Sequence, residues 1–142
     1  HKQGIPLDVI EGWIKSATVE YLGTTKDVRK FIEQADCIVL PSYREGTPRT
    51  LLEASSTAKP IIATDVPGCH NVVDHNFNGL LCKLKDPEDL ADKMYKMANF
   101  NDATLMEMGA NGRRKMEEKF NEEIIFNKYL VALRELHPSI PN

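Results

Sequence analysis

The sequence has few cysteines and no long apolar run, and both features narrow the class of protein. Its three cysteines are too few and too scattered to predict a disulfide framework or a zinc site. Cys37 and Cys82 lie within short apolar runs, so we expect buried free thiols and a reducing compartment, the cytoplasm. No apolar run approaches the ~18–20 residues of a membrane-spanning helix, and no signal peptide is visible.

The chain also lacks an excess of positive charge. Of its 142 residues, 18 are Lys or Arg and 21 are Asp or Glu, which gives a formal net charge of −3. Broad nucleic-acid binding needs a basic face, and this balance does not favour one. The length suits one domain with a real core. Because the first residue is His1 rather than Met, we expect a piece of a longer protein.

Metal-binding and nucleophile signatures are missing as well. The histidines show no ligand spacing, so we expect no metal and no cofactor. Cys69 and His70 are adjacent, and adjacent side chains usually diverge, so a Cys–His nucleophile pair is not predicted. Arg113, Arg114 and Lys115 precede two glutamates and are predicted to form a solvated helix face with local ion pairs.

What is present is an alternation of short apolar runs with helical patterns. Strands are predicted at 18–23, 37–40, 60–64 and 79–84, and a loop at 65–71. Helices are predicted at 6–15, 28–34, 48–58, from 87 to about 98, at 103–120 and at 122–136. This order predicts an α/β fold with a parallel sheet, flanking helices and a helical C-terminal third. Ligands of such sheets bind beyond the carboxyl ends of the strands.

Two carboxylates, Glu45 and Glu53, flank the predicted start of the 48–58 helix. Thr47 can accept a hydrogen bond from a first-turn amide, and Pro48 has no N–H to leave unpaired. Gly46 lets the backbone approach a ligand, while the free amides and the helix dipole favour an anion. Eight helical steps span ~12 Å, which suits a nucleoside diphosphate sugar. An ionised carboxylate accepts two hydroxyl donors, so we expect Glu45 on the sugar and Glu53 on the ribose.

A plainer interpretation of the same residues stays open. Arg49 and Glu53 are four positions apart on one helix face, and a surface ion pair there is worth only about a few tenths of a kcal/mol. Glu45 would then be a solvated loop residue.

Further motifs follow one another in a fixed order over most of the chain. They are Ala35–Ser42, Glu45-Gly46-x-Pro48, Leu52-Glu53-Ala54, Pro60–Asp65, Pro67-Gly68 and Asn78–Leu81, with Leu22-Gly23 before them and Gly112-Arg113 after them. From about Val19 to its end, the chain resembles the retaining glycosyltransferases of family 4, and most of all the bacterial enzymes of capsular and lipid-linked polysaccharide synthesis.

The resemblance implies the GT-B fold, in which two Rossmann-like domains face each other across a cleft. This chain would be a single domain, 1–142, forming most of the C-terminal, donor-binding domain. The acceptor domain would be missing, together with the first strand of the donor domain and the Arg and Lys that usually hold the diphosphate. The helix 122–136 resembles the one that packs on the acceptor domain. The fragment alone is expected to be inactive.

The resemblance also implies roles for individual residues. Glu45 would be catalytic, at the hydroxyls of the donor sugar. Substrate would be bound by Ser42, Gly46, Thr47, Pro48, Leu52 and Glu53. The parent enzyme would transfer a sugar, a hexose or N-acetylhexosamine, from a UDP-sugar to a saccharide or polyprenyl-linked acceptor with retention, without a metal. It would be cytoplasmic, with peripheral association at the inner face of the plasma membrane.

The chain departs from the family pattern in two places. Ala58 stands where relatives often have glycine, which is expected to affect only the helix end. After Pro67-Gly68, relatives often have an arginine or glutamate near the positions of His70 and Asn71. Two other functions stay open: a nucleotide-sugar epimerase or phosphorylase on the same fold, and a non-catalytic nucleotide-binding or scaffold domain. The second predicts an Arg49–Glu53 ion pair and no pocket at the start of the 48–58 helix.

Overall fold

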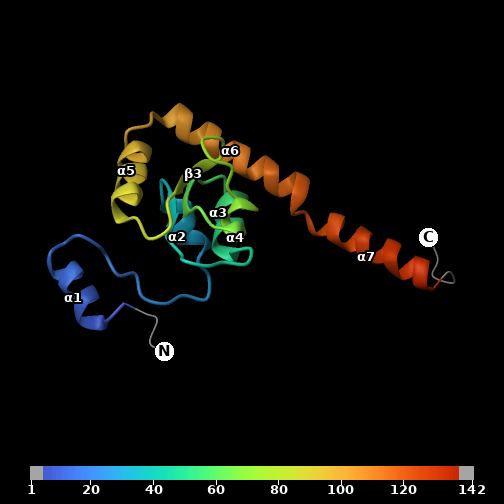
Figure 1. The fold of residues 1–142 in the computed structure, drawn as a ribbon, viewed down its shortest axis with the longest axis horizontal. Helices are drawn as coiled ribbons and strands as arrows, with labels where there is room; N and C mark the ends of the chain where they lie inside the picture. Colours follow the sequence, from blue (N-terminus) through green and yellow to red (C-terminus); the bar gives the residue numbers. More distant parts are fainter. Residues whose placement is uncertain (1–4, 138–142) are drawn as a thin grey trace.

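Three short parallel strands form the centre of the structure, with helices on both faces (Figure 1). The computed structural model describes residues 5–137, apart from the side chain of residue 125. The strands are hydrogen-bonded in the order β1-β2-β3 and comprise β1 (Ile38–Leu40), β2 (Ile61–Thr64) and β3 (Gly79–Cys82). The predicted α/β class, with a parallel sheet and flanking helices, is confirmed.

The described residues form seven helices. They are α1 (Leu7–Lys15), α2 (Arg29–Gln34), α3 (Arg49–Ser56), α4 (Pro67–His70), α5 (Pro87–Ala98), α6 (Asp102–Lys119) and α7 (Glu122–Leu136). The last three begin at the polar residues Asp86, Asn101 and Asn121, whose side chains accept hydrogen bonds from first-turn amides. The C-terminal third is therefore helical, as predicted.

The strand β2 carries the centre of the core. All four of its residues are buried, as expected of an apolar run with both faces covered. Ile61 and Ala63 pack on one face with Leu51 of α3, whereas Ile62 packs on the other with Met97 of α5. Successive side chains of a strand point to opposite faces, so one four-residue run anchors helices on both sides.

The predicted strand at 18–23 is wrong. This segment has no strand assignment, and none of its described residues joins the sheet ladder. Tyr21 and Leu22 are exposed. A strand is held by backbone hydrogen bonds to a neighbouring strand, and no backbone hydrogen bond is found between residues 19–23 and any described strand.

Two smaller corrections concern element bounds. The 65–71 segment was predicted as a loop but contains the short helix α4 at Pro67–His70. The last strand ends at Cys82 rather than at residue 84. Cys82 is buried as predicted, while Cys37 is only half-buried; burial raises the pKa of Cys37 to about 11.

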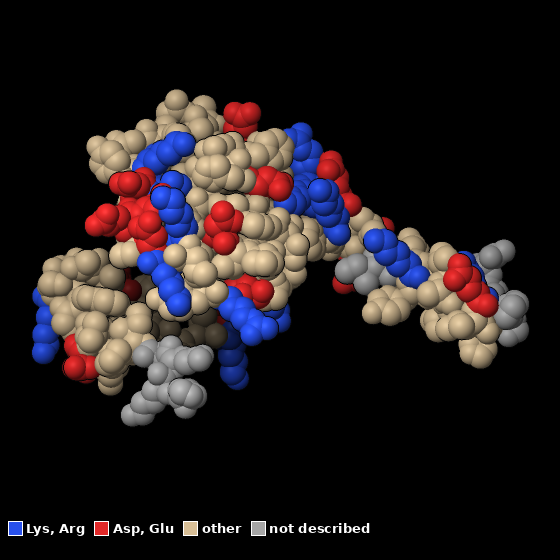
Figure 2. Space-filling model, viewed as in Figure 1, with Lys and Arg blue, Asp and Glu red and all other residues tan. Residues whose placement is uncertain are grey.

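The outer surface mixes the two signs of charge. Figure 2 shows Lys and Arg interspersed with Asp and Glu over the face in view, with α7 extending away from the sheet as in Figure 1. Among residues 5–137, no helix is both long and apolar enough to span a membrane.

Candidate functional site

The predicted site residues come together at the carboxyl edge of the sheet. Ser42 to Pro48 form the loop that follows β1, and α3 begins directly after it. Parallel pairing of β1 with β2 brings the segment that follows β2, including α4, to the same edge. This is where parallel α/β sheets bind their ligands.

The start of α3 is built around the carbonyl of Pro48. The N–H groups of Leu51 and Leu52 both donate to this oxygen, at 3.0 and 3.2 Å. The amides of Arg49 and Thr50 therefore precede the first intrahelical bond and are available to an acceptor. Together with the helix dipole, they favour an anion at this end of α3.

The capping role predicted for Thr47 is wrong. Pro48 occupies the cap position, and no side chain caps α3. The Thr47 hydroxyl instead accepts a hydrogen bond from the Nδ2 of Asn71 at 3.2 Å. Thr47 thus joins the loop after β1 to the segment after β2, a contact that the sequence analysis missed because the two residues are distant along the chain.

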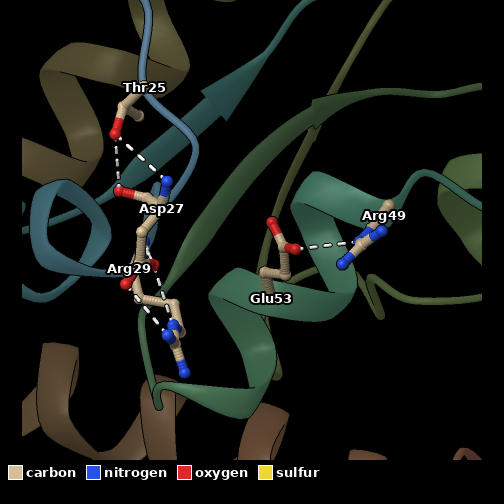
Figure 3. Close-up of polar contacts among 5 residues, drawn as sticks. All are labelled: Thr25, Asp27, Arg29, Arg49 and Glu53. Carbon is tan, nitrogen blue, oxygen red and sulfur yellow. Dashed lines mark hydrogen bonds and ion pairs between the residues drawn. The ribbon is translucent and has the colours of Figure 1, made fainter.

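Glu53 lies one and a half turns into α3 and is paired with Arg49. The Nε of Arg49 donates to the Oε1 of Glu53 at 3.0 Å, and the side chains are 89% and 29% exposed respectively (Figure 3). The ion pair expected for a non-catalytic domain is therefore present. Exposed pairs of this kind contribute about 0–1 kcal/mol, so a ligand hydroxyl can replace Arg49 at little cost.

A second polar group lies close to Glu53. Asp27 accepts hydrogen bonds from both the backbone and the side chain of Arg29, and these bonds lower the pKa of Asp27 from 3.8 to about 2. The pKa of Arg29 is raised mainly by Asp27, with a smaller contribution from the charge of Glu53. Figure 3 shows Glu53 between Arg49 and the group formed by Thr25, Asp27 and Arg29.

Glu45 is half-buried and lies near the segment after β2. The pKa of the buried Cys69 thiol is raised by burial first and by the negative charge of Glu45 second. Glu45 is therefore close enough to α4 to affect one of its side chains. Its backbone is in close contact with Gly68, because a Cβ at Gly68 would lie 2.6 Å from the Glu45 carbonyl carbon.

The remaining predicted site residues differ in exposure. Gly46 and Thr47 are exposed, Pro48 is buried, and Ser42 and Leu52 are half-buried. Leu52 also packs against the core cluster that contains Leu51. Two hollows lie elsewhere, one lined by Ile14 and residues 17–21 and one by residues of α7. Neither is lined by any residue of the Glu45–Glu53 stretch, which lies at the carboxyl edge of the sheet.

The other candidate groups are structural or local. Among the described residues, no three His, Cys, Asp or Glu side chains gather in a way that could hold a metal ion. His70 pairs with Asp65. The prediction of a solvated Arg113–Lys115 face is wrong for Lys115, which is buried and pairs with Asp74 at 2.8 Å. Arg113 does form the expected local pair, with Glu117 at 2.7 Å.

Comparison with known proteins gives concordant results. The family model described as "Glycosyl transferases group 1" matches residues 6–100. An N,N'-diacetylbacillosaminyl-diphospho-undecaprenol alpha-1,3-N-acetylgalactosaminyltransferase of Campylobacter jejuni is 32% identical over 118 residues, covering 83% of this chain and 31% of its own length. A UDP-Gal:alpha-D-GlcNAc-diphosphoundecaprenol alpha-1,3-galactosyltransferase of Escherichia coli is 33% identical, covering 70% of this chain and 25% of its own length.

Solved structures agree with the sequence relatives. A mutant of Staphylococcus aureus TarM, in complex with fondaparinux, alpha-GlcNAc-glycerol and UDP, superposes with a TM-score of 0.78 at 29% identity. The match covers 87% of this chain and 26% of TarM. The chain thus spans between a quarter and a third of the length of these relatives. By the family match over residues 6–100, the chain belongs to the glycosyl transferases group 1 family.

Proposed function

We propose that the chain is the donor-binding part of an enzyme that transfers a sugar from a UDP-sugar to a saccharide or polyprenyl-linked acceptor, with retention, in bacterial surface polysaccharide synthesis. One observation carries the proposal: Glu45 and Glu53 flank the free first-turn amides of α3 at the carboxyl edge of the sheet. A helix start that favours an anion lies between two carboxylates that can accept hydrogen bonds from hydroxyl groups. This order matches a diphosphate that joins a sugar to a ribose.

The relatives support the class of substrate. The names of two of them specify transfer to undecaprenol-diphosphate-linked sugars, and the E. coli relative uses UDP-Gal. The TarM structure contains UDP. In the proposed complex, Glu45 contacts the sugar hydroxyls, Gly46, Thr47 and Pro48 present backbone to the sugar and phosphates, and Glu53 holds the ribose. Ser42 and Leu52 complete the contact surface, Leu52 near the nucleoside.

The proposed transfer uses no metal ion and takes place on the cytoplasmic side of the membrane. Chelation of divalent ions with EDTA is therefore expected to leave the transfer rate of the full-length enzyme unchanged. A rate that falls with EDTA and returns with added Mg²⁺ or Mn²⁺ would show that this part of the proposal is wrong.

The test of the donor site uses two matched glutamates. Glu53 and Glu117 each follow an arginine by four residues on a helix and each pair with it. Titration of UDP into the full-length enzyme is expected to give about a tenfold or greater loss of affinity for Glu53→Ala, because a charged hydrogen bond is worth about 1.5–3 kcal/mol. Glu117→Ala is expected to bind UDP like the wild type.

A second candidate function is a non-catalytic nucleotide-binding domain, which the Arg49–Glu53 pair favours. The same titration tests whether Glu53 belongs to a nucleotide site. If Glu53→Ala and Glu117→Ala both bind UDP as the wild type does, Glu53 is a surface ion-pair residue and the proposed donor site is wrong. Sugar transfer by the full-length enzyme, measured with UDP-galactose and UDP-N-acetylhexosamines, distinguishes a transferase from a binding domain.

A further inference from the structure

The segment after β2, residues 65–74, lies directly against the loop that carries Glu45. Gly68, in the first turn of α4, is where the two segments come closest. A Cβ at this position would overlap the backbone oxygens of Gly46 and Glu45 and lie 2.6 Å from the Glu45 carbonyl carbon. Because backbone cannot move aside like a flexible side chain, only glycine fits here without a shift of the Glu45–Gly46 peptide.

A hydrogen bond adds a second contact between the same two segments. The Nδ2 of Asn71, just after α4, donates to the Thr47 hydroxyl at 3.2 Å. Gly68 and Asn71 therefore contact three successive residues, Glu45, Gly46 and Thr47, from the same side. Those are residues to which the proposed function assigns the sugar hydroxyls and the phosphates.

The segment after β2 is itself anchored to the core by buried polar groups. Asp74 pairs with Lys115 of α6 at 2.8 Å, and the Lys115 side chain is only 8% exposed. The buried side chain of Asn78 accepts from the Asp74 amide at 2.7 Å and donates to the Val72 carbonyl at 2.8 Å. Such bonds give the segment a fixed position rather than that of a free loop.

We propose that Gly68 and Asn71 are positioning residues that hold the Glu45 loop where Glu45 can contact the donor sugar. The segment after β2 then controls sugar transfer more than nucleotide binding. The proposal rests on the proposed donor site. The nucleotide end of that site depends on Glu53, which is on α3 and touches neither Gly68 nor Asn71 in the described contacts. Moving the Glu45–Gly46 peptide therefore displaces the sugar contact and leaves the ribose contact in place.

The experiment compares three glycine variants of the full-length enzyme. Gly68→Ala overlaps backbone at the Glu45 loop, whereas Gly109→Ala overlaps the Ala58 carbonyl at the opposite end of α3. Gly12→Ala, on α1, meets nothing within 4 Å. The measurements are UDP affinity, the kcat and donor KM for sugar transfer with the UDP-sugar that supports the highest rate, and thermal unfolding of each variant.

The expected pattern separates positioning from stability. A displacement of about 1 Å can lower a rate about a hundredfold, so Gly68→Ala should reduce kcat by about 30- to 100-fold. UDP affinity should fall by a clearly smaller factor, because Glu53 and the Arg49 and Thr50 amides, all on α3, still hold the nucleotide. Gly109→Ala should lower the unfolding temperature without a comparable loss of kcat. Gly12→Ala, inside α1, should leave kcat and UDP affinity unchanged and should not lower the unfolding temperature, because alanine is favoured over glycine in a helix. Asn71→Ala, an exposed position, should lower kcat about three- to tenfold without loss of UDP affinity, consistent with the loss of one hydrogen bond.

Two results would overturn the inference. One is wild-type kcat in both Gly68→Ala and Asn71→Ala. The other is a parallel loss of kcat, UDP affinity and unfolding temperature in Gly68→Ala, which would indicate a structural defect rather than a displaced sugar contact. Failure of the donor site itself is a separate result, since Glu53→Ala would then bind UDP as tightly as the wild type.

Discussion

Ala58 has a left-handed backbone conformation, with φ of 54°. It follows the end of α3, where the Ala58 N–H donates to the Ser55 carbonyl and the Lys59 N–H donates to the Ala54 carbonyl. This pattern is the Schellman motif, in which glycine is the usual residue at the left-handed position. The departure from the family glycine at this position therefore affects the end of one helix, and its cost is conformational.

Replacing Ala58 with glycine is expected to stabilise the chain by about 1 kcal/mol. A left-handed conformation costs an L-residue about 1–2 kcal/mol, and glycine avoids this cost. Part of the gain is lost because glycine makes the unfolded state more flexible. Urea unfolding measures the change. Ser56→Gly, two positions earlier and inside the helix, is the control and should destabilise by about 0.5–1 kcal/mol. Lower stability for Ala58→Gly would contradict this explanation.

Individual residues differed in how well the sequence predicted them. Glu45, Gly46, Pro48 and Glu53 were placed at the helix start because local rules for turns and helix ends act over a few positions. The bond between Asn71 and Thr47 was missed, because it joins residues 24 positions apart whose meeting depends on how β1 and β2 pair. Contacts between distant segments are set by the sheet, which no local pattern specifies.

The helices and strands themselves were predictable where the apolar pattern was continuous. β2 and α6 formed close to the predicted bounds, since a buried strand and a long periodic helix give strong signals. Lys115 shows the limit at this scale. It lies seven positions after Met108, on the stripe of α6 that faces inward, yet its basic neighbours suggested a solvated face. The helical spacing from Met108 indicated a buried Lys115, but the prediction followed the run of basic residues instead.

Replacing Asp74 is expected to cost more stability than replacing Lys115, its partner in the ion pair, because Lys115 is the buried member. Asp74→Ala leaves the buried Lys115 ammonium without its partner, so this variant is expected to be destabilised. Because Asp74 itself is half exposed, the expected loss is moderate, about 2–3 kcal/mol. Lys115→Met removes the charge but keeps the apolar stem, and is expected to cost less. Urea unfolding of both variants gives the order. A larger loss for Lys115→Met would mean that the pair itself stabilises the fold.

At the scale of the whole molecule, the first and last helices, α1 and α7, carry several exposed apolar side chains. Phe126, Tyr129 and Leu136 on α7 are exposed, as are Leu7 and Trp13 on α1. The chain spans between a quarter and a third of its relatives' length. That α7 packs on an acceptor domain, as the sequence resemblance implies, stays a prediction.

The proposed split of roles between the chain and the rest of the protein predicts a difference in activity. The isolated chain is expected to bind UDP-sugar more weakly than the full-length enzyme and to transfer no sugar, because the acceptor would be held by residues outside it. A radiolabelled-donor assay with both proteins checks this. Transfer by the isolated chain at a rate comparable to that of the full-length enzyme would contradict the proposed division.

The central claim is that Glu45 and Glu53 grip the two ends of a UDP-sugar whose diphosphate lies at the start of α3. A crystal structure of the full-length enzyme with a bound UDP-sugar measures this most directly. We predict ribose hydroxyls within about 2.5–3.0 Å of the Glu53 carboxylate and sugar hydroxyls at Glu45, with phosphate oxygens on the Arg49 and Thr50 amides. A nucleotide bound elsewhere, with the Arg49–Glu53 pair intact and Glu45 in contact with solvent alone, would contradict the account.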